Sequence, residues 1–106
     1  MSPGRNFLLA IAASIVAMNL VPAIAATLQV TVDRLAYGPV DIKAKVGDTI
    51  AWVNNDILAH TATVKGAFDV MLMPGKTGTL KLTKAGEFDY ICRFHPNMKG
   101  HISVTE

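Results

Sequence analysis

The stretch that decides the fold is GEFDYICRFHPNMKG, residues 86–100. Its first half alternates apolar and polar side chains, as a half-buried β-strand does, so that Phe88, Tyr90 and Cys92 fall on one face. We expect this face to point into the core, which places the sulfur of Cys92 inside the protein. The alternation stops after Cys92, where the chain leaves the strand for a loop.

This loop carries three side chains that can bind a soft metal ion, in the spacing Cys-x2-His-x2-Met: Cys92, His95 and Met98. If the loop curls, the three donors meet at one point. Thiolate and thioether favour Cu(I), and imidazole accepts Cu(II), so this set suits copper. Taken singly, such residues are more often a small buried hydrophobe, a surface histidine and core filler. Their combined spacing at the end of a strand is what favours a metal site.

One more imidazole would complete a His₂Cys site with a weak axial methionine. His60 is the candidate, because it follows the turn residues Asn54-Asn55-Asp56 and opens the run Thr61-Ala62-Thr63-Val64. His60 is far from Cys92 in the sequence, so it must reach the loop through closure of the fold. A site assembled from two distant segments is expected to be rigid.

Alternation of the same kind recurs along the rest of the chain. The other predicted inward residues are Leu28, Val30, Val32, Val40, Ile42, Ala44, Val46, Ile50, Trp52, Leu80, Leu82, Ile102 and Val104. Turn-forming residues separate these runs at Gly38-Pro39, Gly47-Asp48, Asn54-Asn55-Asp56, Pro74-Gly75 and Lys84-Ala85-Gly86. The residues therefore predict an all-β protein, either an antiparallel β-sandwich or a small barrel.

Composition and the N-terminal residues indicate a small exported protein. The 106 residues, 51% hydrophobic with a formal charge of +2, are too few for several domains and too nearly neutral for a nucleic-acid binder. Arg5, the weakly polar run from Phe7 to Met18 and the small-residue site Ala23-Ile24-Ala25 are typical of a cleaved secretory signal peptide over residues 1–25. A retained membrane anchor is the alternative. We expect a single domain over residues 26–106.

Residues 86–92 and 95–100, together with 46–54 and His60, closely resemble the cupredoxins, and among these the short ligand loop is most similar to that of the amicyanins. The resemblance implies a Greek-key β-sandwich that holds one type 1 blue copper ion, cycling between Cu(I) and Cu(II), as a one-electron carrier and not an enzyme. It implies that the equatorial ligands are His60, Cys92 and His95, and that Met98 is the long axial ligand.

The resemblance also implies a cellular location and a mode of binding to redox partners. We expect a periplasmic monomer that meets a donor and an acceptor redox protein in transient contacts near His95, with Phe94, Pro96, Met71 and Met73 forming the contact surface. No nucleic acid and no membrane span after signal cleavage are expected. Arg93-Phe94 stand where amicyanins have Thr-Pro, and Thr61 where an asparagine is common in relatives.

Other interpretations of the same residues remain open. An exported copper-trafficking protein would exchange the ion, and an enzyme or accessory module would keep an exchangeable coordination position. Zinc could occupy a His₂Cys site, although it usually prefers a fourth strong donor. Met71 and Met73 are interpreted as loop packing, with a second Cu(I) site as the alternative. His101 is interpreted as a surface histidine, with auxiliary metal binding as the alternative.

Overall fold

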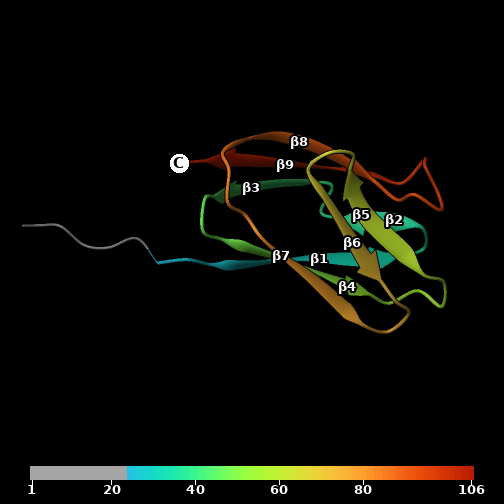
Figure 1. The fold of residues 1–106 in the computed structure, drawn as a ribbon. Helices are drawn as coiled ribbons and strands as arrows, with labels where there is room; N and C mark the ends of the chain where they lie inside the picture. Colours follow the sequence, from blue (N-terminus) through green and yellow to red (C-terminus); the bar gives the residue numbers. More distant parts are fainter. Residues whose placement is uncertain (1–23) are drawn as a thin grey trace, which may run out of the picture.

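The computed structural model describes residues 24–106, which form nine β-strands and no helix (Figure 1). The strands are β1 (Thr27–Asp33), β2 (Ala36–Gly38), β3 (Asp41–Lys45), β4 (Thr49–Asn54), β5 (His60–Val64), β6 (Phe68–Leu72), β7 (Thr77–Lys81), β8 (Gly86–Ile91) and β9 (Lys99–Thr105). All five turns expected from glycine, proline and asparagine fall between strands or include the terminal residue of a strand.

The strands form two sheets, ordered β2-β1-β4-β7 and β3-β9-β8-β5-β6, which pack as the two layers of a sandwich (Figure 1). The prediction of an all-β Greek-key β-sandwich is confirmed. The expectation of purely antiparallel pairing is wrong, because β1 pairs with β4 and β3 with β9 in parallel. Alternating side chains show that a strand is half-buried but not which way its neighbour runs. Here the connection from β1 to β4 passes through β3 in the other sheet, which leaves β1 and β4 parallel.

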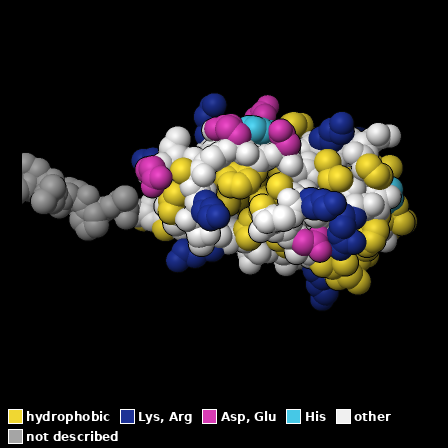
Figure 2. Space-filling view, turned by 45° about the horizontal axis from the view of Figure 1, so that its top comes forward, with side chains coloured by type: hydrophobic (Ala, Val, Ile, Leu, Met, Phe, Trp, Pro, Cys, Tyr) yellow, Lys and Arg dark blue, Asp and Glu magenta, His cyan; other side chains and the backbone are white. Residues whose placement is uncertain are grey.

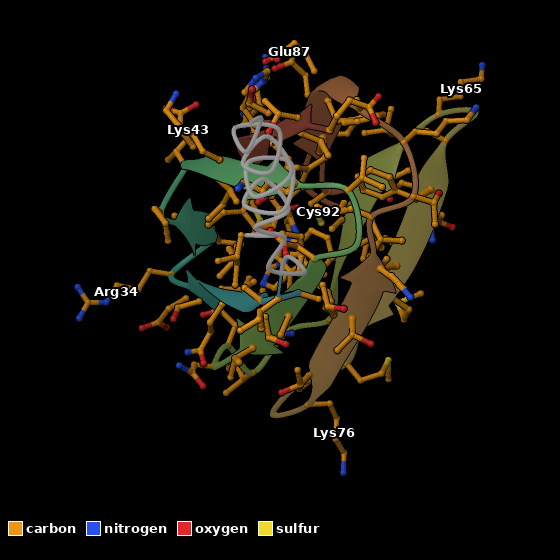
Figure 3. All side chains as sticks on the ribbon, turned by 90° about the vertical axis from the view of Figure 1, so that its left-hand side faces the viewer. Arg34, Lys43, Lys65, Lys76, Glu87 and Cys92 are labelled. Carbon is orange, nitrogen blue, oxygen red and sulfur yellow. The ribbon has the colours of Figure 1, made fainter. Side chains whose placement is uncertain are left out.

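The core lies between the sheets and is built around aromatic side chains from both. Trp52 on β4 and Tyr90 on β8 are fully buried, with ring centroids 5.5 Å apart in an edge-on arrangement. The indole N–H of Trp52 donates to the hydroxyl of Tyr90 at 3.2 Å, so both polar groups are satisfied in a dry interior. Burial raises the pKa of Tyr90 to about 12. Cys92 lies in this interior while the labelled charged side chains point outward (Figure 3).

Two residues predicted to face the core lie at the surface instead. Ile42 and Ala44 on β3 are buried as expected, but Val40 and Val46 are 52% and 38% exposed. Both valines lie beyond the ends of β3, which spans only Asp41–Lys45. The alternation in the sequence therefore continued one residue beyond each end of the strand, although both valines still form backbone hydrogen bonds to the β9 segment.

The segment expected to be loop packing around Met71 and Met73 is partly an edge strand. β6 (Phe68–Leu72) pairs antiparallel with β5, and its Leu72 is fully buried. Met71 points away from the core and is 46% exposed, and Met73 follows the strand with 51% exposure. The interpretation of both methionines as packing residues is therefore wrong: they add apolar surface at the end of the strand.

The expected signal peptide, residues 1–25, lies almost entirely outside the described residues. Within the described part of the chain, no helix has the length and apolar character needed to cross a membrane. The first strand is fixed at its start by Asp48, whose carboxylate accepts the N–H groups of Ala26 and Lys45, each at 2.9 Å. These two bonds lower the pKa of Asp48. The domain is therefore anchored from its first residues.

Candidate metal centre

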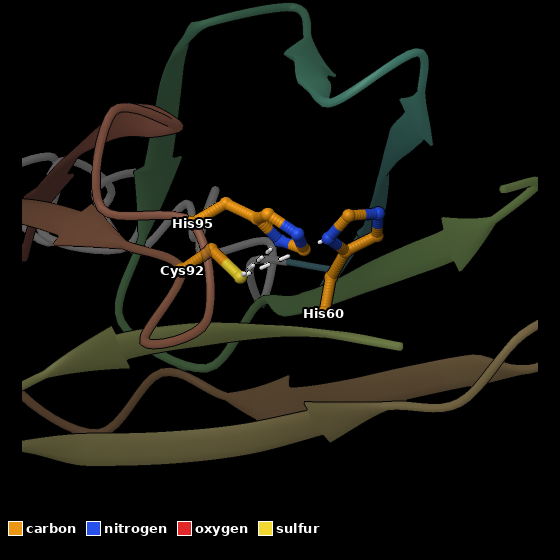
Figure 4. Close-up of side chains that lie close together, drawn as sticks. All are labelled: His60, Cys92 and His95. Atoms are coloured by element: carbon orange, nitrogen blue, oxygen red, sulfur yellow. Dashed lines mark hydrogen bonds between the residues drawn. The ribbon is translucent and has the colours of Figure 1, made fainter. Parts of the chain in front are cut away.

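Three of the four predicted ligands present their donor atoms to one another at one end of the sandwich. The Nδ1 atoms of His60 and His95 lie 3.8 Å and 3.7 Å from the sulfur of Cys92 (Figure 4). The donor atoms of the three residues all lie within 4.8 Å of one another. The convergence expected from the sequence is therefore present, with His60 supplied by β5 and the other two by the loop after β8.

Strand pairing explains how His60 reaches this loop. β5 and β8 are neighbours in the five-stranded sheet, with Thr63 opposite Ile91 in an antiparallel register. The residues before Thr63 therefore run beside the residues after Ile91, which brings His60 to the end of β8. This pairing is short, so contacts beyond the strands complete the junction between the two segments.

The loop from Cys92 to Met98 is closed by its own backbone. The N–H of Met98 donates to the carbonyl of His95 at 2.8 Å, which is a tight turn, and the N–H of Cys92 donates to the carbonyl of Met98 at 3.2 Å. Met98 is 4% exposed and packs in the core cluster that includes Cys92. The structure thus places Met98 in the same closed loop, and its role as the axial ligand stays a prediction.

A carboxylate sets the orientation of the His60 ring. Nε2 of this fully buried histidine lies 2.7 Å from Oδ2 of Asp56. Because the carboxylate only accepts, Nε2 carries the proton and Nδ1 is left with a free lone pair directed at Cys92. Histidines that bind metals commonly use this arrangement, in which the other ring nitrogen donates to a carboxylate. The histidine therefore already has the tautomer that a ligand requires.

Asp56 is itself held in place and kept ionised. Its two oxygens accept the N–H of Arg34 at 2.7 Å and the N–H of Leu35 at 3.1 Å. Burial opposes ionisation of Asp56, but the bonds from Leu35, Arg34 and His60 together lower its pKa below the usual value. Arg34 and Leu35 reach this position through a turn in which both have positive φ, 53° and 60°. From the sequence, Asp56 was predicted only as a turn residue, and its spacing of four residues from His60 was the available signal for this contact.

The sulfur of Cys92 receives a backbone hydrogen bond. Cys92 is a free, fully buried cysteine, and the N–H of Thr61 donates to its sulfur at 3.4 Å. A backbone donor at this place stabilises negative charge on the sulfur. The turn that leads to His60 is fixed by the buried side chain of Asn54, whose amide donates to the carbonyls of Leu58 and Leu72, each at 2.9 Å.

The spacing of the donor atoms fits a first-row transition metal. A metal about 2.0 Å from nitrogen and about 2.3 Å from sulfur, with about 120° between its ligands, requires the two donors to be about 3.7 Å apart. The observed separations are 3.8 Å and 3.7 Å. The residues therefore need little movement to hold an ion, and a thiolate, two imidazoles and a nearby thioether are the donor set that suits copper.

Comparison with known proteins assigns the family. The family model of the cupredoxin-like domain matches residues 6–104. The chain belongs to this family. Among similar proteins, the amicyanin of Paracoccus denitrificans is 31% identical to this cupredoxin over 71% of the chain and 63% of its own length. The amicyanin-alpha of Methylorubrum extorquens is 29% identical over 76% of the chain and 73% of its own length.

The comparison extends to solved structures. The reduced Cu(I) form at pH 4 of an amicyanin variant superimposes on this cupredoxin with a TM-score of 0.65 and 30% identity, over 79% of the chain and 85% of that structure. The resemblance to cupredoxins, and to amicyanins in particular, is therefore confirmed.

His101 lies on the outer face of β9, as alternation predicts, and belongs to a different cluster. Its Nδ1 lies 2.6 Å from Asp89 and its Nε2 2.7 Å from Glu87. On the face drawn in Figure 2, acidic side chains gather around a histidine. The hydrogen bonds that His101 donates to Asp89 and Glu87 raise its pKa. Both ring nitrogens thus have a carboxylate partner, as in a surface ion pair.

Proposed function

We propose that this cupredoxin carries single electrons between redox proteins through a copper ion held by His60, Cys92, His95 and Met98. The observation that carries the proposal is the placement of two imidazole Nδ1 atoms 3.7–3.8 Å from a buried, unpaired cysteine sulfur. Copper bound at these donors supplies one-electron chemistry by alternating between Cu(I) and Cu(II). Four side chains at the site leave no open position for a substrate, which favours a carrier over an enzyme.

The protein residues around the donors keep the site the same before and after electron transfer. Asp56 holds the His60 ring, the N–H of Thr61 holds the Cys92 sulfur, and the closed backbone of the loop holds His95. Because these contacts are made by the protein itself, little reorganisation is needed when the charge of the ion changes. A rigid, dry site of this kind is suited to rapid electron exchange.

We propose that electrons enter and leave beside His95. His60 and Cys92 are fully buried, whereas His95 is partly exposed and follows Phe94, which is 48% exposed. Leu72 lies opposite His60 in the pairing of β5 with β6. The residues on either side of it, Met71 and Met73, add exposed apolar side chains. A small apolar surface supports the weak, short-lived contacts of redox partners, whose interfaces are typically below about 1,200 Å².

We also propose that residues 1–25 are removed during export and that residues 26–106 work in the periplasm as a monomer. The basic residue, apolar run and small-residue site near the N-terminus support this. The mass of the protein recovered from a periplasmic extract tests it. A chain that begins near residue 26 is expected, and a full-length chain held in the membrane fraction contradicts the proposal.

The experiment for the main proposal is a titration of the metal-free protein with Cu(II), followed by visible absorption. An intense thiolate-to-copper band is expected in the wild type and in the control variant His101→Gln, and none in Cys92→Ser. A wild-type protein that stays colourless overturns the proposal. Copper that leaves readily to a mild chelator overturns the carrier function in favour of metal trafficking.

A further inference from the structure

Thr61 lies between the two segments that carry the candidate ligands, and each of its polar atoms has a partner. Its N–H donates to the sulfur of Cys92 at 3.4 Å, and its carbonyl accepts the hydroxyl of Tyr37. Its hydroxyl oxygen accepts the N–H of Arg93 at 2.9 Å and lies 2.8 Å from Oγ1 of Thr63. Thr61 is fully buried, so water does not compete for these contacts.

The hydroxyl contacts continue to the surface, where they end on Asp69. Oγ1 of Thr63 lies 2.6 Å from Oδ1 of Asp69. The hydrogen bonds from Thr63 and Arg93 lower the pKa of Asp69, so its carboxylate is ionised at neutral pH. An ionised carboxylate can only accept, which means that Thr63 donates its hydroxyl proton to Asp69.

Because the series of hydrogen bonds ends on the Asp69 carboxylate, the donor and the acceptor of each hydrogen bond in it are determined. A hydroxyl has one proton, and that of Thr63 is used on Asp69, so the proton shared by the two threonines must come from Thr61. The oxygen of Thr61 is then free to accept the N–H of Arg93. Without Asp69, Thr63 could donate to Thr61 instead, and the buried proton of Thr61 would lose its partner. The carboxylate thus selects the only direction in which all buried donors are satisfied.

The hydrogen bonds form a closed ring, because Arg93 contacts both Thr61 at one end of the series and Asp69 at the other. The Nε of Arg93 donates to the same Oδ1 of Asp69 at 3.0 Å, and its guanidinium lies 5.4 Å from the ring centroid of Phe94. The residue that follows Cys92 is therefore held twice, through its backbone by Thr61 and through its side chain by Asp69. Three segments meet in this ring: β5, the outer face of β6 and the start of the ligand loop.

We propose that the relay from the Arg93 N–H through Thr61 and Thr63 to Asp69 positions the Cys92 sulfur and its bond from the Thr61 N–H, and thereby tunes the reduction potential of the metal centre. Thr63 and Asp69 are positioning residues, since neither touches a donor atom of the site. The part of the inference that concerns the potential rests on the proposed function. The claim that the relay holds the backbone N–H of Arg93 does not depend on the proposed function.

The first test uses the metal-free protein. Thr63→Val keeps the shape of the side chain and removes its hydroxyl, while Thr63→Ser keeps the hydroxyl and serves as the rescue. Thr79→Val, on the exposed face of β7, is the matched control. Amide hydrogen exchange measured by NMR is expected to be at least about tenfold faster at Arg93 in Thr63→Val, and unchanged in the other two variants. An unchanged rate at Arg93 in Thr63→Val overturns the relay.

The second test measures the reduction potential of the same variants loaded with copper. A hydrogen bond to the sulfur draws electron density from it and favours the reduced ion, so a weaker bond lowers the potential. A lower potential is expected for Thr63→Val, with recovery in Thr63→Ser and none of the change in Thr79→Val. A potential equal to that of the wild type overturns the tuning role.

The two tests separate the inference from the proposed function. If no variant takes up copper, the proposed function fails, and the amide exchange of the metal-free protein still decides whether the relay holds Arg93. If Thr63→Val does not fold, Asp69→Ala replaces it, because it removes the end of the relay at an exposed position. Faster exchange at Arg93 is expected there too, and an unchanged rate contradicts the proposal.

Discussion

Asp56→Asn is the substitution that tests most sharply how the ligand geometry is held. In the wild type, Oδ1 accepts the N–H of Arg34, and Oδ2 accepts both the N–H of Leu35 and Nε2–H of His60. An asparagine has one oxygen and one amide NH₂ in place of the two oxygens. If its oxygen faces Arg34, its NH₂ faces His60 and favours the tautomer with the proton on Nδ1. In that tautomer Nδ1 has no lone pair to offer the metal. If its oxygen faces His60, its NH₂ meets the N–H of Arg34.

Either orientation loses at least one charge-assisted bond and weakens the preference for the correct tautomer. Loss of such a carboxylate partner typically costs 10–100-fold in metal affinity, or about 1.4–2.7 kcal/mol. We expect this loss for copper in a competition titration with a chelator, and a change of the His60 tautomer in the ¹⁵N NMR spectrum of the metal-free protein. Asp41→Asn, on the exposed face of β3, is the control. Wild-type affinity together with an unchanged tautomer in Asp56→Asn would refute the reasoning.

Three further substitutions test the core, the surface cluster and the contact surface. Gly100→Ala places a Cβ against the ring of Tyr90, which is buried and bonded to Trp52, so we expect a loss of about 1–3 kcal/mol in urea unfolding, and an unchanged midpoint contradicts this. Because the pKa of His101 is raised, its charged form stabilises the fold at pH values below 6.5, the ordinary pKa of histidine. Because the pKa of Glu87 is lowered, its charged form stabilises the fold at pH values above 4.5, the ordinary pKa of glutamate. The stability lost in His101→Gln should therefore be largest between pH 4.5 and 6.5 and should shrink as the pH rises through the pKa of His101, whereas a pH-independent difference speaks against the ion pair. Phe94→Glu should slow electron exchange with redox partners while the absorption band is kept, and an unchanged exchange rate with every partner would place the electron port elsewhere.

Local pattern predicted the centre of the fold well because the features concerned are local. The alternation of Phe88, Tyr90 and Cys92 depends only on the two-residue period of a strand, and the structure confirms that Tyr90 and Cys92 are buried. The spacing from Cys92 to Met98 likewise lies within one turn of chain. The prediction of His60 needed one further assumption, that the sandwich closes, and the neighbouring positions of β5 and β8 bear it out.

Features that depend on contacts between distant segments were missed. The parallel pairing of β1 with β4 is a property of the topology, which a strand's own residues do not encode. β6 did carry a signal, since Phe68, Val70 and Leu72 alternate, but the outward Met71 obscured it. The partnership of Asp56 with His60 depends on a turn geometry set by Arg34 and Leu35 in another segment. Within residues 54–60, only the spacing of four residues between Asp56 and His60 hinted at it.

The most direct test of the account is X-ray absorption at the copper edge of the loaded protein. We expect one short sulfur ligand and two nitrogen ligands in the nearest shell, with the sulfur lost in Cys92→Ser and one nitrogen lost in His60→Ala. A nearest shell of oxygen and nitrogen alone, unchanged by either substitution, would contradict it.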